Sequence, residues 1–422
     1  MGPDELTARV GEFLDQKKAR PPVGESLHTR RLRYQIRSAI KYVSSYFLKC
    51  DEVNGSEIVV DGKKVINMGS CSYLGLEQDP RVIEGAKRAV SKYGAQFSSS
   101  IRFMSVALYE EMHELYTRIF GTPHVITAPS TTLAHLTAIP VIVDDNDLVL
   151  MDQLVHNSVQ MAVDLLAKRK IPTRFVPHND LKTLEEILCD NAHKYRRVWF
   201  FCDGIYSMSG DALNLAGMEY LRDAYKNLHL YIDDAHGMSW CGKNGRGYIL
   251  GNVNRTERLS VAVSHSKCFG AGGGSVILSD QDDYYSVRGF GDPLIFGGPM
   301  QPGTLGAAVE SAKIHLSEDI RALQHSLHQK IEATENVFMD RGENQFKGSR
   351  SPVFFLKVGS DKDVFSVFNN LMDYGYYTNP CKFPAVPKGS GGIRFTITVN
   401  HSSREIMKFS ESLTSIIDNR PN

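Results

Sequence analysis

The chain lacks an excess of charge of either sign. Its 422 residues carry 48 basic and 48 acidic side chains, so the formal net charge is zero. Proteins that bind nucleic-acid phosphates usually show a basic excess, so nucleic acid is not expected as a partner. The seven cysteines form no C-x-x-C pair and have no metal-ligand spacing. This pattern is typical of reduced thiols in a cytosolic protein and predicts no metal site.

Long apolar runs are also missing. The longest, such as residues 138–143, are far too short to span a bilayer, and the first five residues contain acidic side chains and no apolar signal core. The chain has no internal repeats and no low-complexity segment. Hydrophobic residues make up 42% of it, which is ordinary for a globular protein with a sizeable core. We therefore expect a soluble cytoplasmic protein of two or three structural units.

Residues 1–56 are polar and charged, and we expect them to form an N-terminal arm. Leu32, Ile36, Ile40 and Val43 recur at helical spacing among arginines, so part of the arm should be an amphipathic helix. The pattern favours packing of this helix on the domain or on a second subunit. The alternative, which the pattern favours less, is contact of its basic face with a membrane surface.

From His124 onward, short β-branched runs alternate with segments of helical length. The expected strands cover residues 125–127, 148–151, 173–176, 198–201, 228–232, 259–263 and 274–278. This alternation predicts an α/β fold with a large, mostly parallel sheet that is covered on both faces.

The flanking segments complete the expected fold. Residues 57–67 should form a hairpin, and Asp79-Pro80 should begin a helix, since aspartate is a good N-cap and proline suits the first helical position. A long helical segment at about 302–338 is followed by strand and helix patterns that indicate a small α+β domain. We thus expect a large domain over residues 57–310, and a linking helix with a small C-terminal domain over residues 311–422.

Polar clusters directly follow four of the expected strands. They cover residues 152–158, 203–211, 233–237 and 264–267. Carboxyl ends of parallel strands are where open α/β sheets bind ligands. Lys267 lies among small residues there, so desolvation can lower its pKa enough for it to act as an amine nucleophile towards a carbonyl. Each cluster alone could be an ordinary loop, but together they suit a bound heteroaromatic cofactor.

The motifs in these clusters carry a specific resemblance. Ser-Tyr-Leu-Gly-Leu at 72–76, Asp-Gly-x-x-Ser-Met-x-Gly-Asp at 203–211, Asp-Asp-Ala-His-Gly at 233–237 and Ser-x-Ser-Lys at 264–267 occur in this order. Over residues 57–410 the chain resembles the α-oxoamine synthase family. The resemblance implies the fold type I of pyridoxal-phosphate (PLP) transferases, with PLP bound by the large domain.

The resemblance also assigns roles to residues. Lys267 would hold PLP and serve as the base at the substrate Cα, Asp233 would pair with the pyridine nitrogen, His236 would hydrogen-bond the phenolic oxygen, and His156 would stack on the ring; these four are the expected catalytic residues. The other expected cofactor contacts are Ser130, Thr131, Thr132, Asp203, Ser207, Ser264, Gly297 and Gly298. The expected substrate contacts are Arg394, whose fork suits a carboxylate, Ser72 and Tyr73.

Three segments depart from the family pattern. Cys71-Ser72 stands where the family has two residues that carry amide or acid side chains. Thr131-Thr132 stands where the family has a glycine and an aromatic residue in the phosphate loop. Gly297-Gly298 stands where the family has Ser-Thr, in a segment that reaches the partner subunit's phosphate. Since the lysine, the aspartate and both histidines remain, these changes indicate an altered substrate choice.

We therefore expect an acyltransferase that condenses an amino acid with an acyl thioester, with loss of CO2, to give an α-aminoketone. Two alternatives remain open: a PLP-dependent aldolase or lyase, and a non-catalytic partner subunit of a heteromeric synthase, against which Lys267 argues. An aminotransferase fits the Asp-Asp-Ala-His-Gly motif less well. A homodimer with active sites at the subunit interface is expected. The amino acid, the acyl chain and its carrier, coenzyme A or an acyl-carrier protein, stay open.

Overall fold

The computed structural model describes residues 48–339, 350–383, 385–387 and 389–419. The chain divides into two compact units, residues 1–69, 356–394 and 407–422 in one, and residues 70–355 and 395–406 in the other. We call them the small unit and the large unit. The amphipathic helix expected in the N-terminal arm lies outside the described residues. No described helix combines the length and the apolar character needed to cross a membrane.

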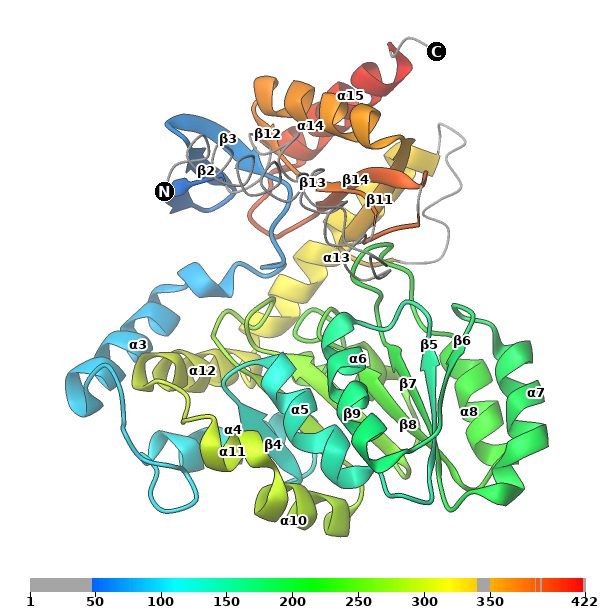
Figure 1. Cartoon of the computed structure of the whole chain (residues 1–422). Helices are drawn as coiled ribbons and strands as arrows, with labels where there is room; N and C mark the ends of the chain where they lie inside the picture. The colour runs from blue at the N-terminus through cyan, green and yellow to red at the C-terminus, as the bar shows by residue number, and fades with distance from the viewer. Residues whose placement is uncertain (1–47, 340–349, 384, 388, 420–422) are drawn as a thin grey trace, which may run out of the picture. The chain divides into compact units, whose positions relative to one another are not determined.

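A seven-stranded sheet forms the centre of the large unit (Figure 1). In sheet order its strands are β4 (Val125–Ala128), β10 (Gly274–Leu278), β9 (Leu259–Ser264), β8 (Leu228–Asp233), β7 (Val198–Asp203), β5 (Leu148–Asp152) and β6 (Thr173–Val176). β10 is antiparallel to both of its neighbours, and the other pairs are parallel. The seven expected strands and the mostly parallel sheet are therefore confirmed.

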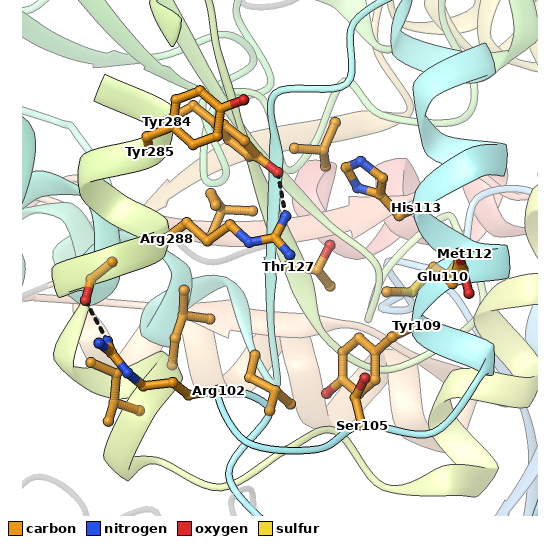
Figure 2. Close-up of a pocket in the computed structure, with 16 residues that line it drawn as sticks. Arg102, Ser105, Tyr109, Glu110, Met112, His113, Thr127, Tyr284, Tyr285 and Arg288 are labelled. Atoms are coloured by element: carbon orange, nitrogen blue, oxygen red, sulfur yellow. Dashed lines mark hydrogen bonds between the residues drawn. The ribbon is translucent and has the colours of Figure 1, made fainter. Parts of the chain in front are cut away.

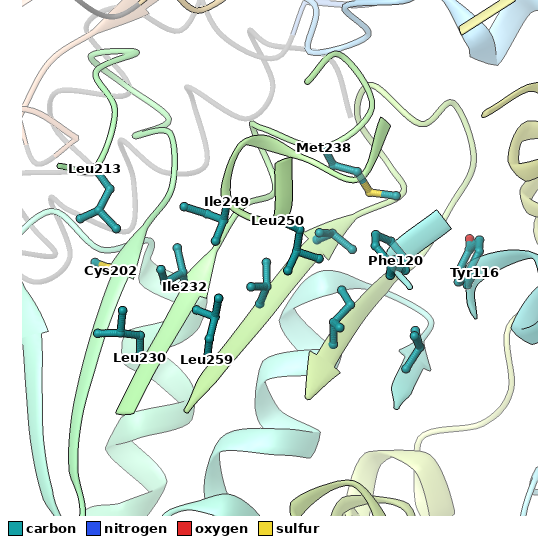
Figure 3. Close-up of a cluster of buried hydrophobic side chains, with 14 of the residues drawn as sticks. Tyr116, Phe120, Cys202, Leu213, Leu230, Ile232, Met238, Ile249, Leu250 and Leu259 are labelled. Carbon is teal, nitrogen blue, oxygen red and sulfur yellow. The ribbon is translucent and has the colours of Figure 1, made fainter. Parts of the chain in front are cut away.

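Except for the edge strand β6, which is largely exposed, the strands are mostly buried on both faces, which explains their continuous apolar sequences. Side chains alternate between the faces of a strand. In β7, Phe200 and Cys202 join one core cluster, while Trp199 and Phe201 join the other. Figure 3 shows the first cluster, in which Cys202 lies beside side chains of neighbouring strands. A fully buried sheet needs apolar residues at every position, so the period-2 pattern of a half-exposed strand is absent here.

Helices cover both faces of this sheet. On the face of Trp199 the core includes residues of α5 (Thr131–Ile142), α6 (Asn157–Asp164) and α10 (Gln281–Phe290). On the face of Phe200 it includes residues of α4 (Leu108–Phe120), α7 (Leu181–Asn191), α8 (Leu215–Ala224) and α12 (Pro302–His315). α3 (Pro80–Tyr93) begins as expected, because the side chain of Asp79 accepts a hydrogen bond from the Arg81 amide.

The segment expected as one long helix is two helices. α12 ends at His315, and α13 (Asp319–Met339) begins after three residues. Ser317 explains the break, because its hydroxyl donates to the Ile314 carbonyl and accepts from the Asp319 amide, so it replaces helical hydrogen bonds with local ones.

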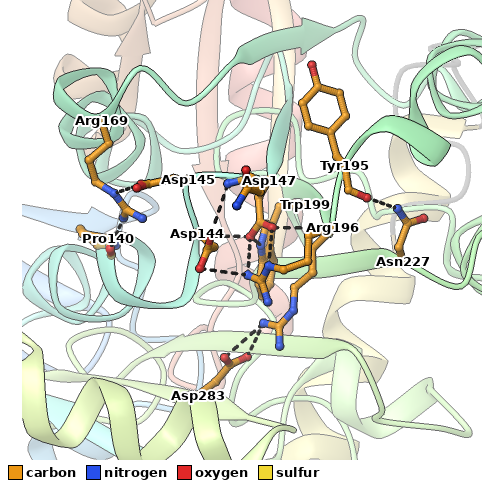
Figure 4. Close-up of polar contacts among 12 residues, drawn as sticks. Pro140, Asp144, Asp145, Asp147, Arg169, Tyr195, Arg196, Trp199, Asn227 and Asp283 are labelled. Atoms are coloured by element: carbon orange, nitrogen blue, oxygen red, sulfur yellow. Dashed lines mark hydrogen bonds and ion pairs between the residues drawn. The ribbon is translucent and has the colours of Figure 1, made fainter.

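A buried carboxylate ties the amino ends of β5 and β7 together (Figure 4). The side chain of Asp147 is fully buried and accepts hydrogen bonds from the Arg196 guanidinium at 2.9 and 3.1 Å and from the Trp199 indole at 3.1 Å. It also accepts from the Asp144 amide at 2.9 Å. These contacts fix the ends of the strands opposite to the expected site.

The small unit is built on short strands. β1 (Cys50–Asn54), β2 (Glu57–Val60), β3 (Lys63–Asn67) and β12 (Tyr376–Tyr377) form one sheet, and its β2–β3 hairpin confirms the expected one. β1 was not predicted, and its fully exposed residues offer no alternation to detect. The small unit also contains α14 (Asp361–Asp373), β13 (Asn379–Cys381) and most of α15 (Ser403–Asp418), β11 (Val353–Gly359) and β14 (Gly391–Thr396). β11, β14 and β13 form a second sheet.

Candidate active site

Two buried aspartates end neighbouring strands of the large unit. Asp203 of β7 and Asp233 of β8 are paired in register and are 3% and 4% exposed. Burial raises the pKa of Asp203 well above its usual range, and the adjacent Asp233 raises it further. Burial also acts on Asp233, but the charges of His135 and Lys267 and a hydrogen bond from His135 lower its pKa below the usual range. The pKa shifts of the two carboxyl groups therefore point in opposite directions, and Asp233 is the more acidic of the pair.

His135 is a site residue that sequence reasoning missed. It lies in α5, is fully buried, and places Nε2 3.0 Å from Asp233 Oδ2 and Nδ1 2.9 Å from the Tyr231 hydroxyl. The Ala235 amide donates to Asp233 Oδ1 at 3.0 Å. Both carboxylate oxygens are thus held. The available signal was a single histidine within an otherwise apolar helix, four residues after Thr131.

His156 and its loop also come to this edge of the sheet. The His156 amide donates to Asp203 Oδ1 at 3.0 Å, and its ring Nδ1 lies 2.6 Å from the Ser158 hydroxyl and accepts from the Ser158 amide. Burial lowers the pKa of His156, and the charges of Lys267 and His135 lower it further against the opposing effect of Asp233. The imidazole is therefore neutral at pH 7, as suits a ring that stacks on an aromatic cofactor.

Lys267 follows β9, the next strand of the sheet. β9 ends at Ser264, and the lysine lies in a turn closed by a hydrogen bond from the Gly270 amide to the Lys267 carbonyl at 3.1 Å. Its charge acts on the pKa values of Asp203, Asp233 and His156. The structure thus gathers these four residues into one electrostatic cluster.

Hydroxyl groups and a helix N-terminus lie beside the lysine turn. Ser130 is the N-cap of α5 and forms an isolated bridge with Gly273, while Ser264 pairs with Gly274 across β9 and β10. A Cβ atom on Gly274 would lie 2.5 Å from Thr131 Cα, so only glycine lets α5 approach this closely. Thr131 and Thr132 form the first turn of α5, where backbone N–H groups favour anions. This cradle suits a phosphate.

His236 is held by two contacts. Its Nδ1 lies 2.7 Å from the hydroxyl of Tyr73, which is fully buried, and its carbonyl accepts from the Trp240 indole at 2.6 Å. The Ser72 hydroxyl donates to Glu77. The structure therefore places Tyr73 against His236, and the expected contact of Tyr73 with substrate stays a prediction.

The other expected residues are placed less directly. Ser207 lies in the loop between Asp203 and Asp211, whereas Gly297 and Gly298 are exposed after α11 (Asp292–Phe296). Arg394 belongs to the small unit, where it is buried and donates to Asn379 Oδ1 at 3.1 Å. Their roles stay predictions.

His178 and Asn179 belong to a second hydrogen-bond network, which the sequence analysis did not predict. Imidazole Nδ1 of His178 is 3.1 Å from Asp152 Oδ1, and its Nε2 is 2.9 Å from Asp211 Oδ2. Asn179 donates its amide to Asp152 and its side-chain amide to Asp211, both at 3.0 Å. The only signal in the sequence was the pair His178-Asn179 just after β6, and such a polar pair is equally typical of an ordinary loop after a strand.

The residues present fit PLP. Asp233, with its lowered pKa, suits the ring nitrogen, the cradle of Ser130, Ser264 and the α5 N-terminus suits the phosphate, and Lys267 suits the aldehyde carbon. Each group lies at the same edge of the sheet, because the strand ends that carry them share it.

Comparisons with known proteins agree with this geometry. The model of the aminotransferase class I and II family matches residues 63–413. A serine palmitoyltransferase from Bacteriovorax stolpii is 32% identical over 365 residues, 86% of this chain and 84% of the relative. An 8-amino-7-oxononanoate synthase from Thermosipho melanesiensis is 30% identical over 369 residues, 86% of this chain and 90% of the relative.

The fold is shared with solved structures. A serine palmitoyltransferase from Sphingomonas wittichii superposes with a TM-score of 0.84 at 21% identity, over 93% of this chain and 98% of that one. An 8-amino-7-oxononanoate synthase from Francisella tularensis gives a TM-score of 0.71 over 84% and 98%. The chain belongs to the aminotransferase class I and II family and, within it, to the α-oxoamine synthases, the PLP-dependent enzymes of fold type I that condense an amino acid with an acyl thioester and release CO2.

Proposed function

We propose that this chain performs that condensation with Lys267, Asp233, His236 and His156 as its catalytic residues. One observation carries the proposal: the buried Asp233 carboxylate is held on both oxygens, by His135 at 3.0 Å and by the Ala235 amide at 3.0 Å, and its pKa is lowered by His135 and Lys267. Burying a charge is costly unless the site is built to hold it, so such a carboxylate indicates a functional site.

Bound PLP supplies an electron-withdrawing ring that weakens the bonds at the substrate Cα. Asp233 would keep the ring nitrogen protonated, and His135 fixes the direction of the Asp233 carboxylate through the contact at 3.0 Å. Because Tyr73 engages Nδ1 of His236, Nε2 is the nitrogen that would reach the phenolic oxygen. Lys267 would remove and return the proton at Cα.

For the substrates, we propose an amino acid and an acyl thioester carried by coenzyme A or by an acyl-carrier protein. Arg394 would bind the amino-acid carboxylate, with Ser72 as a further contact. L-Serine with a palmitoyl thioester is the first pair to test, because a relative at 32% identity is a serine palmitoyltransferase. L-Alanine is the second candidate, since an 8-amino-7-oxononanoate synthase is 30% identical.

We further propose a cytoplasmic homodimer. A cavity of about 820 Å³ lies between β4, α4 and α10, and Arg102, Tyr109 and Arg288 are among its lining residues (Figure 2). β4 is the last strand of the sheet on this side. Phe103 and Phe290, each next to a lining residue, are 84% and 74% exposed. An apolar rim beside a sheet edge is typical of a surface that a second subunit covers. Light scattering coupled to gel filtration tests this, and a monomer would contradict it.

The function is tested by spectroscopy and product analysis. Purified protein titrated with PLP should gain a visible absorbance band that Lys267→Ala loses and that Lys182→Ala, a change at an exposed lysine, retains. With the correct amino acid and acyl thioester, the wild-type protein should release CO2 and free thiol in equal amounts. A protein that binds no PLP, or that releases CO2 without consuming thioester, would contradict the proposal.

A further inference from the structure

His178 joins the loops that follow two strands of the sheet. Its Nδ1 is 3.1 and 3.2 Å from the two oxygens of Asp152, which ends β5, and its Nε2 is 2.9 Å from Asp211 Oδ2, in the loop after β7. The imidazole is half-buried, with a side chain 26% exposed. It contacts neither Lys267 nor Asp233 in these hydrogen bonds, so it lies outside the set of catalytic residues.

Each carboxylate that His178 contacts organises a loop. Asp152 Oδ1 accepts from the Leu154 amide at 2.7 Å, and the Asp152 carbonyl accepts from the Val155 amide at 3.1 Å. These two bonds form the turn that delivers His156 to the sheet edge.

The second loop carries Ser207. The Asp211 carbonyl accepts from the Tyr206 amide at 2.9 Å, and the Tyr206 carbonyl accepts from the Gly210 amide at 2.9 Å. The ring of Tyr206 meets the imidazole of His178 edge-on, at 4.3 Å between centroids. The loop from Asp203 to Asp211 is therefore closed on itself and rests on His178.

We propose that His178 is a positioning residue, which bridges Asp152 and Asp211 and thereby holds His156 and Ser207 in place for PLP. The inference rests on the proposed function, because it assigns the two loops to the cofactor. Its physical basis is that a site is only as precise as the contacts that fix the residues touching the ligand.

The bridge works best with a doubly protonated ring. The charged groups that face the imidazole are Asp152 and Asp211, and both of its nitrogens meet carboxylate oxygens. Burial alone would lower the pKa of His178, but the hydrogen bonds and charges of both carboxylates raise it to about 9. When the ring loses a proton, one nitrogen presents a lone pair to a carboxylate, so that side of the bridge opens.

The experiment measures PLP affinity and the visible circular dichroism of bound PLP in full-length protein, from pH 7 to pH 10. The variants are His178→Ala, Asp211→Asn and the control His229→Ala. His229 is a partly buried histidine near the amino end of β8. Its ring is tilted against that of Trp199 at 5.0 Å between centroids, and it is remote from the carboxyl ends of the strands.

At pH 7 we expect His178→Ala to weaken PLP binding on the order of tenfold and to reduce the dichroism of the bound cofactor. At metal sites, removal of the residues that hold the metal ligands in place has an effect of this size. His229→Ala should change neither. Asp211→Asn keeps an acceptor but removes a charge, so the pKa of the imidazole falls and the alkaline loss of PLP affinity should move to lower pH. A merely structural role would not move this pH profile.

Two results distinguish a failure of this inference from a failure of the proposed function on which it rests. Suppose that the wild-type protein binds PLP. The positioning role alone would then be overturned if the His178→Ala variant had equal PLP affinity and dichroism, or if the Asp211→Asn variant had an unshifted pH profile. Wild-type protein that binds no PLP would overturn the proposed function and this inference together. If His178→Ala does not fold, Asp211→Asn decides.

Discussion

Protonation of His178 should stabilise the folded protein below about pH 9. The pKa of this imidazole is about 9 in the folded protein, because Asp152 and Asp211 outweigh the effect of burial, against 6.5 for an ordinary histidine. The folded state therefore binds the proton more tightly than the unfolded state does. The resulting stability is fully present below about pH 6.5 and is lost as the pH rises through 9.

The magnitude follows from the two pKa values. The difference between 6.5 and about 9 corresponds to about 3 kcal/mol of unfolding free energy. The His178 side chain is 26% exposed, so solvent screening is modest and this figure is an upper value. It is a large share of the total for a folded domain, which is commonly about 5–15 kcal/mol.

Urea unfolding of the PLP-free protein at intervals from pH 6 to pH 10 checks this. The difference in unfolding free energy between wild type and His178→Gln should be about 3 kcal/mol near pH 6 and should shrink towards zero above pH 9. Other groups that titrate in this range affect both proteins and cancel in the difference. A difference that stays constant with pH would refute the reasoning, since it would show that packing rather than charge holds His178.

Three further predictions concern the site and its support. Asp233→Asn should lower kcat by about 100-fold or more, because a neutral amide does not hold the proton on the ring nitrogen. By contrast, Asp203→Asn should change the unfolding free energy by less than about 1 kcal/mol, because burial and the nearby Asp233 disfavour the charged form of Asp203. Asp147→Ala should destabilise the protein by about 2–4 kcal/mol, since the buried Trp199 indole and the partly exposed Arg196 guanidinium lose their acceptor; chemical denaturation measures this. Gly274→Ala should cost about 1–3 kcal/mol and weaken PLP binding, because the new Cβ would lie 2.5 Å from Thr131 Cα; thermal unfolding and PLP titration check both effects.

Two of these predictions have a matched comparison variant. Equal loss of kcat in an Asp233→Glu variant, which keeps the charge, would show that geometry rather than charge decides at that position. Gly289→Ala is the control for Gly274, because a Cβ at Gly289 meets nothing within 4 Å. Wild-type stability of Asp147→Ala would contradict the role of the network in Figure 4.

Much of the fold was predictable, because its signals are local. The seven strands of the large sheet are apolar runs bounded by polar residues, and α3 begins where Asp79-Pro80 predicts it. The break between α12 and α13 was not predicted, since Ser317 is compatible with either a helix or a turn. The domain boundaries at residues 56 and 310 stay predictions.

The candidate site was predictable to the extent that it lies at strand ends. The sequence alone determined that Asp203, Asp233 and Lys267 follow parallel strands, and parallel strands bring such residues to one edge. It also determined the family, through motifs whose order and spacing are specific. The individual roles in the reaction remain predictions.

Tertiary structure alone decided how the pKa values of the site side chains shift and which residues hold these side chains in place. His135 and Asp233 are 98 residues apart in the chain, and His178 and Asp211 are 33 apart, so no local pattern shows that they touch. The pKa values of two aspartates shift in opposite directions, because burial and a neighbouring carboxylate raise that of Asp203, whereas His135 and Lys267 lower that of Asp233. Burial and the identity of spatial neighbours set a pKa, and both exist only once the chain has folded.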